Sequence, residues 1–435
     1  MREKPLVYVG MSVDILHHGH VNIIEEAHKL GDVVVGLLTD SAISEFKRIP
    51  YLEYSEREKI VRRFVGVVDV VPQETWDYAP NISKLRPDYM VHGDDWLSGS
   101  QTIFRDNAIS ALNTYGGQLI EIPYTTGVSC SSMYEHYQSG SIPADRRAQQ
   151  LRRLLQTPNI TRIIETHSPV AAMIAENASV LDQLNRKRFF HGFWSSSLTD
   201  SCVRGVPDTE VLSLADRLVN IDQILDVTTK PLIMDGDTGG RSEHLTLNIK
   251  AMCRRGVSAV IFEDKTGLKR NSLFGTDVLQ ELEDVDTFAE KIRLAVEAKT
   301  FSEFMVIARL ESLIAGMSMD DAILRANAYV QAGADGIMIH SRQSQPDEVI
   351  EFCRLFRAHH EKVPLIAVPS SYNGVTEDEL SAAGVNIVIY ANHLFRASYK
   401  AMLNTAESIL SNGRSFEIDK DLISIKEALS LIPGT

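Results

Sequence analysis

From about residue 160 onward, short apolar runs alternate with helix-forming segments for more than 200 residues. Strands separated by helices form parallel sheets that are covered on both faces. This number of repeats favours a closed (β/α)8 TIM barrel over an open sheet. The runs predicted as strands are residues 189–194, 232–235, 259–263, 305–310, 336–340, 365–368 and 387–390.

Polar residues recur where these predicted strands end. They are Ser196, Asp235, Glu263, Arg309, His340 and Asn392. Because the carboxyl ends of barrel strands point toward one rim, these side chains are expected to converge there. Their joint position is a stronger indication of a site than any one of them.

Two of these positions, together with Asp237, predict a metal site. Asp235 and Asp237 alternate around Gly236, and Glu263 ends the next strand. Hard oxygen ligands of this kind suit Mg²⁺. The alternative is that the acids cap βα loops.

The segment 265–272 follows Glu263 and contains Lys265, Gly267, Lys269 and Arg270. We interpret it as a lid over an anion, and the alternative is a solvated surface loop. Arg309 and His340 could hold carboxylate and phosphoryl oxygens, although such residues are often structural.

The first part of the chain is a second, smaller α/β unit. Its predicted strands are residues 6–9, 33–38, 67–71, 89–91 and 118–122, and its helices include 20–30 and 55–64, the latter with Ser55 as N-cap. With 435 residues the chain exceeds one core, so two domains are expected. We predict domains at 1–137 and 148–435 joined by a linker at 138–147, with a charged helix from about 145 to 155 leading into the second domain.

The run His17-His18-Gly19-His20 lies between the first predicted strand and the first predicted helix. A helix N-terminus presents free N–H groups and positive potential, which suits phosphate. Two imidazoles at a spacing of three can face the same phosphate, and Gly19 permits close backbone approach. The alternative is a histidine-rich loop without a role or a stray metal patch.

Bulk properties exclude several classes of function. The net charge is −14, and residues 1–140 already carry 19 Asp and Glu against 12 Lys and Arg, so nucleic-acid binding is not expected. No apolar run reaches the roughly 18 residues of a membrane span, and the N-terminus has no signal-peptide layout. The four cysteines form no CxxC pair, which argues against a zinc site or a disulfide framework. A cytoplasmic protein is expected.

Roughly residues 5–135 resemble cytidylyltransferase-type nucleotidyltransferases, through segments 8–14, 17–20, 39–40, 55–57, 92–95 and 126–129 together with Lys47. The resemblance implies a Rossmann-like domain in which a phosphate or phosphonate oxygen attacks the α-phosphorus of CTP and pyrophosphate leaves, assisted by Mg²⁺. It implies that His17 and His20 stabilise the transition state and that Lys47 binds phosphates. The implied nucleotide-binding residues are Val9, Gly10, Asp14, Gly19, Arg57, His92, Asp94, Thr126, Gly127 and Ser129.

This chain departs from the family at Tyr124. The family's second signature motif, which corresponds to residues 124–129 here, usually begins with arginine at this position. A phosphate contact is then missing or supplied by another residue such as Arg57. This leaves open a first domain that binds CTP without turning it over, or one that serves mainly in assembly.

Roughly residues 160–430 resemble phosphoenolpyruvate mutase of the isocitrate lyase superfamily, through segments 194–198, 206–208, 235–239, 263–265, 269–272, 308–311, 340–341 and 391–393. The resemblance implies a phosphoryl shift between the enolate oxygen and carbon 3 of pyruvate, which converts phosphoenolpyruvate into phosphonopyruvate. The enolate must escape protonation, so the lid has to exclude water.

The same resemblance implies roles for individual residues. Asp235 would ligate Mg²⁺ directly, with Asp237 and Glu263 acting through water. Asp208, Lys269 and Asn271 would act on or around the migrating phosphoryl group. The implied substrate-binding residues are Trp194, Ser196, Ser197, Leu198, Ser272, Arg309 and His340.

Two relatives of the mutase compete with this interpretation. Isocitrate-type lyases need a cysteine in the lid, and segment 265–272 has none. Phosphonopyruvate hydrolase typically replaces the lid asparagine, so Asn271 favours the mutase.

The fusion resembles the bifunctional mutase–cytidylyltransferases of bacterial phosphonate antibiotic pathways, in particular the streptomycete fosfomycin route. This implies that the first domain attaches CMP to 2-hydroxyethylphosphonate, with 2-aminoethylphosphonate as the alternative acceptor. Other enzymes would act between the two steps. The barrel family also implies a dimer of dimers with an exchanged terminal helix.

Overall fold

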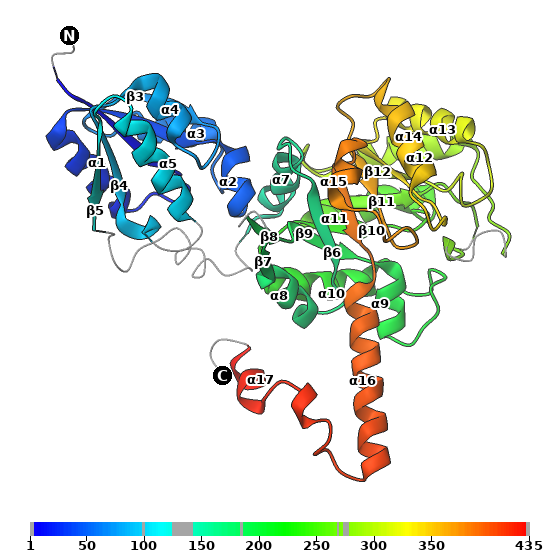
Figure 1. The fold of residues 1–435 in the computed structure, drawn as a ribbon. Coiled ribbons are helices and arrows are strands. Elements are labelled where there is room, and N and C mark those ends of the chain that lie inside the picture. The colour runs from blue at the N-terminus through cyan, green and yellow to red at the C-terminus, as the bar shows by residue number, and fades with distance from the viewer. Residues whose placement is uncertain are drawn as a thin grey trace.

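The chain forms two α/β units that follow one another along the sequence (Figure 1). The structure is a computed structural model that describes residues 4–97, 101–123, 142–182, 186–267, 269–272 and 278–431. Within these ranges, no helix is long and apolar enough to cross a membrane.

The N-terminal unit is a five-stranded parallel sheet in the order β3-β2-β1-β4-β5. Its elements are β1 (Leu6–Met11), α1 (His18–Leu30), β2 (Asp32–Leu38), α2 (Asp40–Phe46), α3 (Tyr54–Val61), β3 (Val67–Gln73), α4 (Ala79–Leu85), β4 (Tyr89–Gly93), the 3₁₀ turn η1 (Asp94–Trp96), α5 (Thr102–Asn113) and β5 (Gln118–Ile122). All six residues of β1 are buried, because this strand is central and helices cover both faces.

The order of this sheet reverses at β1, which pairs with β2 on one side and with β4 on the other. Ligands of open α/β sheets bind outside the carboxyl ends of the strands at such a switch point. The loop after β1 and the end of β4 therefore border the expected ligand crevice.

The C-terminal unit is a closed barrel of eight parallel strands in the order β10-β11-β12-β13-β14-β15-β6-β9. The strands are β6 (Thr161–Glu165), β9 (Gly192–Ser195), β10 (Leu232–Asp235), β11 (Ala259–Glu263), β12 (Met305–Leu310), β13 (Gly336–Ile339), β14 (Leu365–Ala367) and β15 (Ile387–Tyr390). The predicted fold class, a Rossmann-like domain followed by a TIM barrel, is thus confirmed.

Helices and a hairpin surround the barrel. They are α7 (Ala144–Leu154), α8 (Pro169–Asn177), the hairpin strands β7 (Ser179–Leu181) and β8 (Lys187–Phe189), α9 (Ser197–Val203), α10 (Leu214–Asp226), α11 (Ser242–Arg254), α12 (Val285–Glu297), α13 (Met319–Gln331), α14 (Asp347–Arg357), α15 (Glu377–Ala382) and α16 (His393–Asn412), followed by η5 (Asp419–Asp421) and α17 (Ile425–Ser430). α7 begins inside the segment that was predicted as linker.

Three local predictions were wrong. The predicted strand 189–194 is two strands, because β8 belongs to the hairpin and only β9 belongs to the barrel. Strand β6 was missed, since its sequence Thr-Arg-Ile-Ile-Glu has too few apolar residues to stand out. The N-cap of α3 is Glu53, which forms a capping box with Glu56, and Ser55 lies inside the helix.

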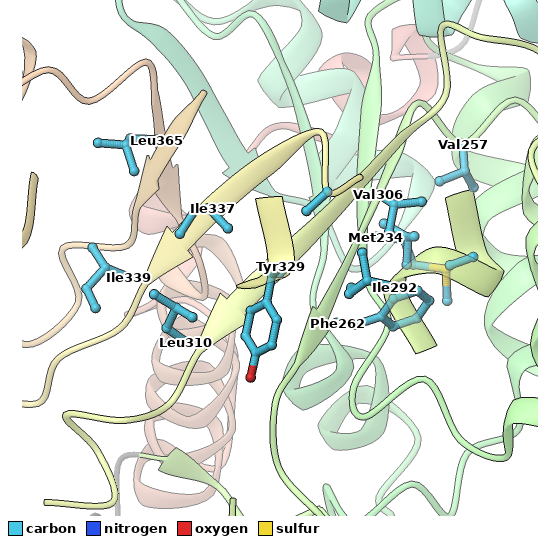
Figure 2. Close-up of a cluster of buried hydrophobic side chains, with 14 of the residues drawn as sticks. Met234, Val257, Phe262, Ile292, Val306, Leu310, Tyr329, Ile337, Ile339 and Leu365 are labelled. Atoms are coloured by element: carbon cyan, nitrogen blue, oxygen red, sulfur yellow. The ribbon is translucent and has the colours of Figure 1, made fainter. Parts of the chain in front are cut away.

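The main core fills the space between the barrel strands and their helices. Figure 2 shows part of this cluster, in which Phe262 lies near Ile292, and Tyr329 lies near Leu310. The barrel interior holds a second cluster that includes Ile163, Ile233 and Ile307. Leu151 of α7 belongs to this inner cluster, so α7 is packed onto one end of the barrel.

His191 precedes β9 and provides a test of how burial affects pH stability. It is 5% exposed, and its Nδ1 accepts a hydrogen bond of 2.9 Å from the Arg162 amide. Burial, aided by the charges of Arg162 and Lys230, lowers the pKa of His191 from 6.5 to about 3. The unfolded chain therefore binds a proton below pH 6.5 that the folded chain refuses, so stability falls as pH drops from 6.5 toward 3.

We expect His191→Asn, which retains an acceptor but cannot titrate, to show a shallower loss of unfolding free energy between pH 7 and pH 5 than the wild type. Urea unfolding at several pH values measures this difference. The exposed His359→Asn serves as control and should keep the wild-type dependence. Equal slopes in His191→Asn and wild type would contradict the assignment.

Candidate active sites

The ammonium of Lys269 lies among carboxylates at the carboxyl-terminal end of the barrel. It contacts Asp237 Oδ1 and Ser197 Oγ directly, and lies 3.2 Å from Asp208 Oδ1 and 3.7 Å from Asp235 Oδ2. Lys269 is only 5% exposed. Burial alone would lower the pKa of Lys269, but the surrounding carboxylates raise it above its usual value, so the lysine is cationic.

Asp235 ends β10 and is held as an anion. Its Oδ2 accepts a bond of 2.8 Å from Ser197 Oγ. Burial would raise the pKa of Asp235, but the positive charges of Lys269, Arg309 and Arg217 hold that pKa well below its usual value. Asp235 is therefore a permanent negative charge in a dry site.

The backbone after β10 brings the second carboxylate alongside. Asp237 has φ 52°, a conformation that non-glycine residues adopt at a cost of about 1–3 kcal/mol and that clusters at functional sites. Its amide donates to Asp235 Oδ1 over 3.2 Å. Gly236 is required here, because a Cβ would lie 2.5 Å from the ring of Phe262.

Glu263, at the end of β11, is 1% exposed, and both of its carboxylate oxygens are buried without a hydrogen-bond partner. Its nearest cations are Arg309 Nη2 at 3.4 Å and Lys265 Nζ at 3.5 Å. Burial raises the pKa of Glu263 to about 7. Orphaned buried oxygens are rare and indicate an absent ligand, ion or water.

The predicted metal ligands are near one another but are not arranged as a ready metal site. Within the described ranges, no three His, Cys, Asp or Glu side chains form a group that could hold a metal ion. Lys269 contacts the oxygens of Asp235 and Asp237 that a cation would use. The donor set still fits Mg²⁺, because it consists of hard oxygens and neither carboxylate oxygen of Glu263 has a hydrogen-bond partner.

A second charged network lies beside the first. Arg309, in β12, donates to Glu311 Oε1 over 2.5 Å and to Ser272 Oγ over 2.8 Å. His340 follows β13, with Nδ1 2.8 Å from Glu311 Oε1 and 2.9 Å from Arg309 Nη2. Burial and the Arg309 charge lower the pKa of His340, so it is neutral at pH 7. An arginine and a neutral imidazole here can bind oxygens of an anionic substrate.

The predicted lid is folded over these networks. Lys265 donates to the Arg270 carbonyl over 2.7 Å and to Ser272 Oγ over 2.9 Å, which ties the segment to itself. Asn271 Nδ2 lies 3.3 Å from Asp208 Oδ2. Two predicted lid residues, Lys269 and Asn271, therefore lie against the carboxylate cluster.

The predicted substrate-binding residues at the end of β9 also have little exposed surface. Trp194 is 3% exposed, with its indole N–H buried and without a partner. Ser196 and Ser197 are buried at the start of α9, and Leu198 beside them is half-buried. An orphaned donor and a helix start at this rim suit an anionic ligand.

In the N-terminal unit, His17 and His20 lie together at the start of α1. Their ring centroids are 3.9 Å apart, and the His17 amide lies 3.3 Å from His20 Nδ1. Burial, with the charges of His17 and Lys47, lowers the pKa of His20 to about 4, while its hydrogen bond with the His17 backbone opposes the shift. Gly19 lies between them in the first turn. Nearby, Val13 has φ 48°, which is a strained conformation for a β-branched residue.

Arg57 is fully buried and its guanidinium is used by protein groups. It donates to the carbonyls of Ser12, Leu38 and Leu52 at 2.6, 2.9 and 3.2 Å, and to Asp40 Oδ1 at 2.6 Å. In this arrangement its guanidinium holds carbonyls beside the strand ends that border the crevice.

Other predicted nucleotide-binding residues are divided between crevice and core. Asp14 Oδ1 accepts from the Tyr51 amide over 2.5 Å, and Val9 is buried in the core. A Cβ on Gly10 would lie 2.3 Å from Tyr78, so this glycine admits the tyrosine ring. His92 stacks on Trp96 at 3.7 Å.

Five further predicted positions belong to this unit. Asp94 begins η1, directly after β4. Lys47 caps α2 with its ammonium 5.2 Å above the Trp76 ring. Thr126, Gly127 and Ser129, together with Tyr124, lie outside the described residues.

Two residues at the barrel site were not predicted from the sequence. Arg217 of α10 is 3% exposed and donates to Asp200 Oδ2 over 3.0 Å and to the Asp235 carbonyl over 2.5 Å. A signal existed, because Arg217 falls on the apolar face of its helix. Glu311 belongs to segment 308–311, for which the sequence predicted a role only at Arg309, but Arg309 and His340 hold the pKa of Glu311 well below its usual value despite burial.

Comparison with known proteins agrees with this architecture. The sequence model of the phosphoenolpyruvate phosphomutase family matches residues 151–410, and the cytidylyltransferase-like model matches residues 8–114. A similar curated protein is the phosphonopyruvate hydrolase of Variovorax sp. (strain Pal2), 38% identical over 285 residues that cover 65% of this chain and 93% of the relative.

Solved structures resemble the barrel part. Phosphoenolpyruvate phosphomutase from Streptomyces platensis subsp. rosaceus has a TM-score of 0.60 at 35% identity, covering 65% of this chain and 94% of that chain. Phosphonopyruvate hydrolase in complex with oxalate and Mg²⁺ has a TM-score of 0.58 at 34% identity, covering 67% and 95%. The phosphomutase family model matches residues 151–410, which is more than half of this chain. The chain therefore belongs to the phosphoenolpyruvate phosphomutase family and carries a cytidylyltransferase-like domain ahead of the barrel.

Proposed function

We propose that the barrel interconverts phosphoenolpyruvate and phosphonopyruvate. The observation that carries this proposal is the Lys269 ammonium, enclosed with Asp208, Asp235 and Asp237 beneath a lid that holds Asn271. A cation in a dry site stabilises a migrating phosphoryl group far better than it would in water. The O–P bond breaks, a C–P bond forms at carbon 3, and no proton or water is consumed.

The chain's own residues divide this work. Arg309 and His340 bind substrate oxygens, and Arg309 is fixed for this by Glu311. Lys269 and Asn271 hold the phosphoryl group, while the lid, tied down through Lys265, excludes water. Asp235, Asp237 and Glu263 would hold Mg²⁺, which would polarise the enolate oxygen.

Hydrolysis of phosphonopyruvate is the second candidate, because the 38% identical relative carries that name. It requires a water molecule where the mutase must exclude one. The presence of Asn271, whose amide donates to Asp208 over 3.3 Å, favours the mutase, because phosphonopyruvate hydrolase typically replaces the lid asparagine.

For the first domain we propose transfer of CMP from CTP to a small phosphonate, with 2-hydroxyethylphosphonate as the preferred acceptor. The paired rings of His17 and His20 at the switch point of the sheet support this, because they can donate to phosphate oxygens from a helix start. Transfer to 2-aminoethylphosphonate, or CTP binding without turnover, is the alternative. Fosfomycin biosynthesis is the proposed setting.

Phosphorus NMR of the purified full chain with Mg²⁺ tests both domains. From phosphonopyruvate, a mutase yields the phosphoenolpyruvate signal and a hydrolase yields inorganic phosphate. In separate tubes, CTP with 2-hydroxyethylphosphonate or 2-aminoethylphosphonate should give a phosphonate–CMP anhydride pair and pyrophosphate. Inorganic phosphate as the sole product from phosphonopyruvate would contradict the mutase. The absence of an anhydride in both CTP reactions would contradict these two acceptors.

We further propose that the chain assembles as a dimer of dimers. The helix α16 buries none of its residues and projects from the barrel (Figure 1), with Tyr399, Met402, Leu403 and Leu410 exposed along one stripe. Beside its base, a cavity of about 420 Å³ over β6 and β15 is lined by residues that include Phe190 and Tyr390. In this proposal part of a second copy's α16 packs against this cavity and covers the stripe.

We expect the double variant Met402→Asp with Leu410→Asp to lower the molar mass in light scattering coupled to gel filtration. The reason is that a carboxylate on the stripe cannot be buried without a partner. Asn404→Asp, on the opposite side of α16, adds a charge and should leave the mass unchanged. An unaltered mass in the double variant would rule out the stripe as the interface.

A further inference from the structure

Helix α7 joins the two domains through three arginines that each bind a run of backbone carbonyls. Arg147 donates to the carbonyls of Lys230, Leu225 and Thr228, and Arg152 donates to Ser302, Glu303 and Phe304, all near the amino-terminal ends of barrel strands. With Leu151 inside the barrel, these contacts fix α7 to the barrel.

The third arginine points the other way, into the N-terminal domain. Arg153 Nη1 donates to the carbonyls of Pro50 and Tyr51 at 2.6 and 3.2 Å, and Nη2 donates to Leu52 at 3.3 Å. Nη2 also lies 2.7 Å from Asp40 Oδ2. Arg153 is 5% exposed, so these are buried, charge-assisted contacts.

The carbonyls that Arg153 binds belong to the 47–53 loop, which connects α2 to α3 and has no regular secondary structure. Side chains hold this loop: Asp14 accepts from the Tyr51 amide, and Gln149 of α7 donates to Glu53 over 3.1 Å. The loop begins at Lys47 and is tied through Tyr51 to Asp14, which lies in the segment between β1 and α1 that leads to His17. One loop thus connects α7 to the segment that carries the histidine pair.

Asp40 links the same contacts to the rest of the first domain. Its Oδ1 accepts from Arg57 and its Oδ2 from Arg153, so one carboxylate lies between two buried guanidiniums. Arg57 in turn holds the carbonyls of Ser12 and Leu38 at the ends of β1 and β2. The position of the 47–53 loop therefore depends on a residue supplied by the barrel domain.

We propose that Arg153 is a positioning residue of the nucleotidyl-transfer site, which holds the 47–53 loop so that Lys47 faces the CTP phosphates beside His20. The first domain is then incomplete without α7, although the mutase site lies at the other end of the barrel. This inference rests on the proposed CTP chemistry of the first domain.

The test uses the full chain with Arg153→Met, Arg153→Lys, Lys47→Met and the Lys47→Met/Arg153→Met double variant. Arg153→Met should raise the KM and Kd for CTP about tenfold, since a displaced phosphate ligand weakens binding. Mutase turnover should stay at its wild-type level. Arg153→Lys should recover part of the loss, because an ammonium can still reach Asp40 or one carbonyl.

The matched control is Arg152→Met, on the neighbouring position of α7, which loses contacts to the barrel only and should keep wild-type CTP affinity. The double variant separates positioning from general damage. If Arg153 acts through Lys47, then adding Arg153→Met to Lys47→Met should cause no further loss of CTP affinity.

Each outcome is decisive. Unchanged CTP affinity in Arg153→Met, or additive losses in the double variant, would overturn the inference. If Arg153→Met does not fold, Arg153→Lys decides, and wild-type affinity there counts against the proposal. If the wild type binds CTP but transfers no CMP, the proposed reaction is wrong. The Kd values of the Arg153 variants for CTP then still test whether Arg153 positions the loop. If the wild type does not bind CTP, both are wrong.

Discussion

An Asp235→Asn variant is expected to lose interconversion of phosphonopyruvate and phosphoenolpyruvate by about a thousandfold or more. The side chain keeps its shape but loses the negative charge that faces Lys269, Arg309 and Arg217. It also loses the carboxylate placed first among the proposed Mg²⁺ ligands. The buried Lys269 then has less compensation, so the melting temperature should fall as well.

Phosphorus NMR from phosphonopyruvate measures the first effect, and thermal unfolding measures the second. CTP affinity of the same sample serves as an internal control, because Asp235 lies in the barrel and its hydrogen bonds and ion pairs go to barrel residues such as Ser197, Asp237 and Lys269. Asp222→Asn is the matched control, since the Asp222 carboxylate on α10 forms an exposed pair with Arg255, which follows α11. Turnover within about tenfold of wild type would remove Asp235 from the centre of the mechanism.

The second large effect is expected for His20→Ala, which should lower CMP transfer by about 10²–10³-fold and leave mutase turnover unchanged. His20 is neutral at pH 7 in the free protein because its pKa is lowered to about 4. It therefore acts as a hydrogen-bonding imidazole beside His17. Removing it takes away a fixed donor for phosphate oxygens.

His18→Ala is the control for this variant, because His18 belongs to the same run but is exposed. It should keep at least half of the wild-type transfer rate, within the usual scatter of surface changes. Both rates come from the same CTP reactions followed by phosphorus NMR. Equal losses in the two variants would point to damage at the start of α1, and equal retention would point to a first domain that only binds CTP.

Much of the site could be predicted because it lies at strand ends. Asp235, Glu263, Arg309 and His340 were recognised from their position after apolar runs, and the barrel places all of them at one rim. The strand β6 could not be recognised in the same way, because burial of Thr161 and Glu165 comes from neighbours in the closed barrel and not from its own sequence.

Buried charges were predicted less well than apolar strands. The family resemblance implies a nucleotide-binding role for Arg57, but it does not indicate the three carbonyls and Asp40 that the structure gives as its partners. The sequence around Arg217 gives no indication of its role except that Arg217 falls on the apolar face of a helix. The role of a buried charged residue can be inferred only when its partner is known, and tertiary packing determines those partners.

The sequence by itself determined the two-domain α/β architecture and the chemistry at the ends of the strands, because period and strand-end position are local properties of a chain. Only the tertiary structure decided that Lys269 lies among Asp208, Asp235 and Asp237, and that Arg153 holds a loop about a hundred residues earlier. These contacts join segments far apart along the chain. They depend on the closure of the barrel and the docking of the two domains, and neither of these produces a periodic pattern in the sequence.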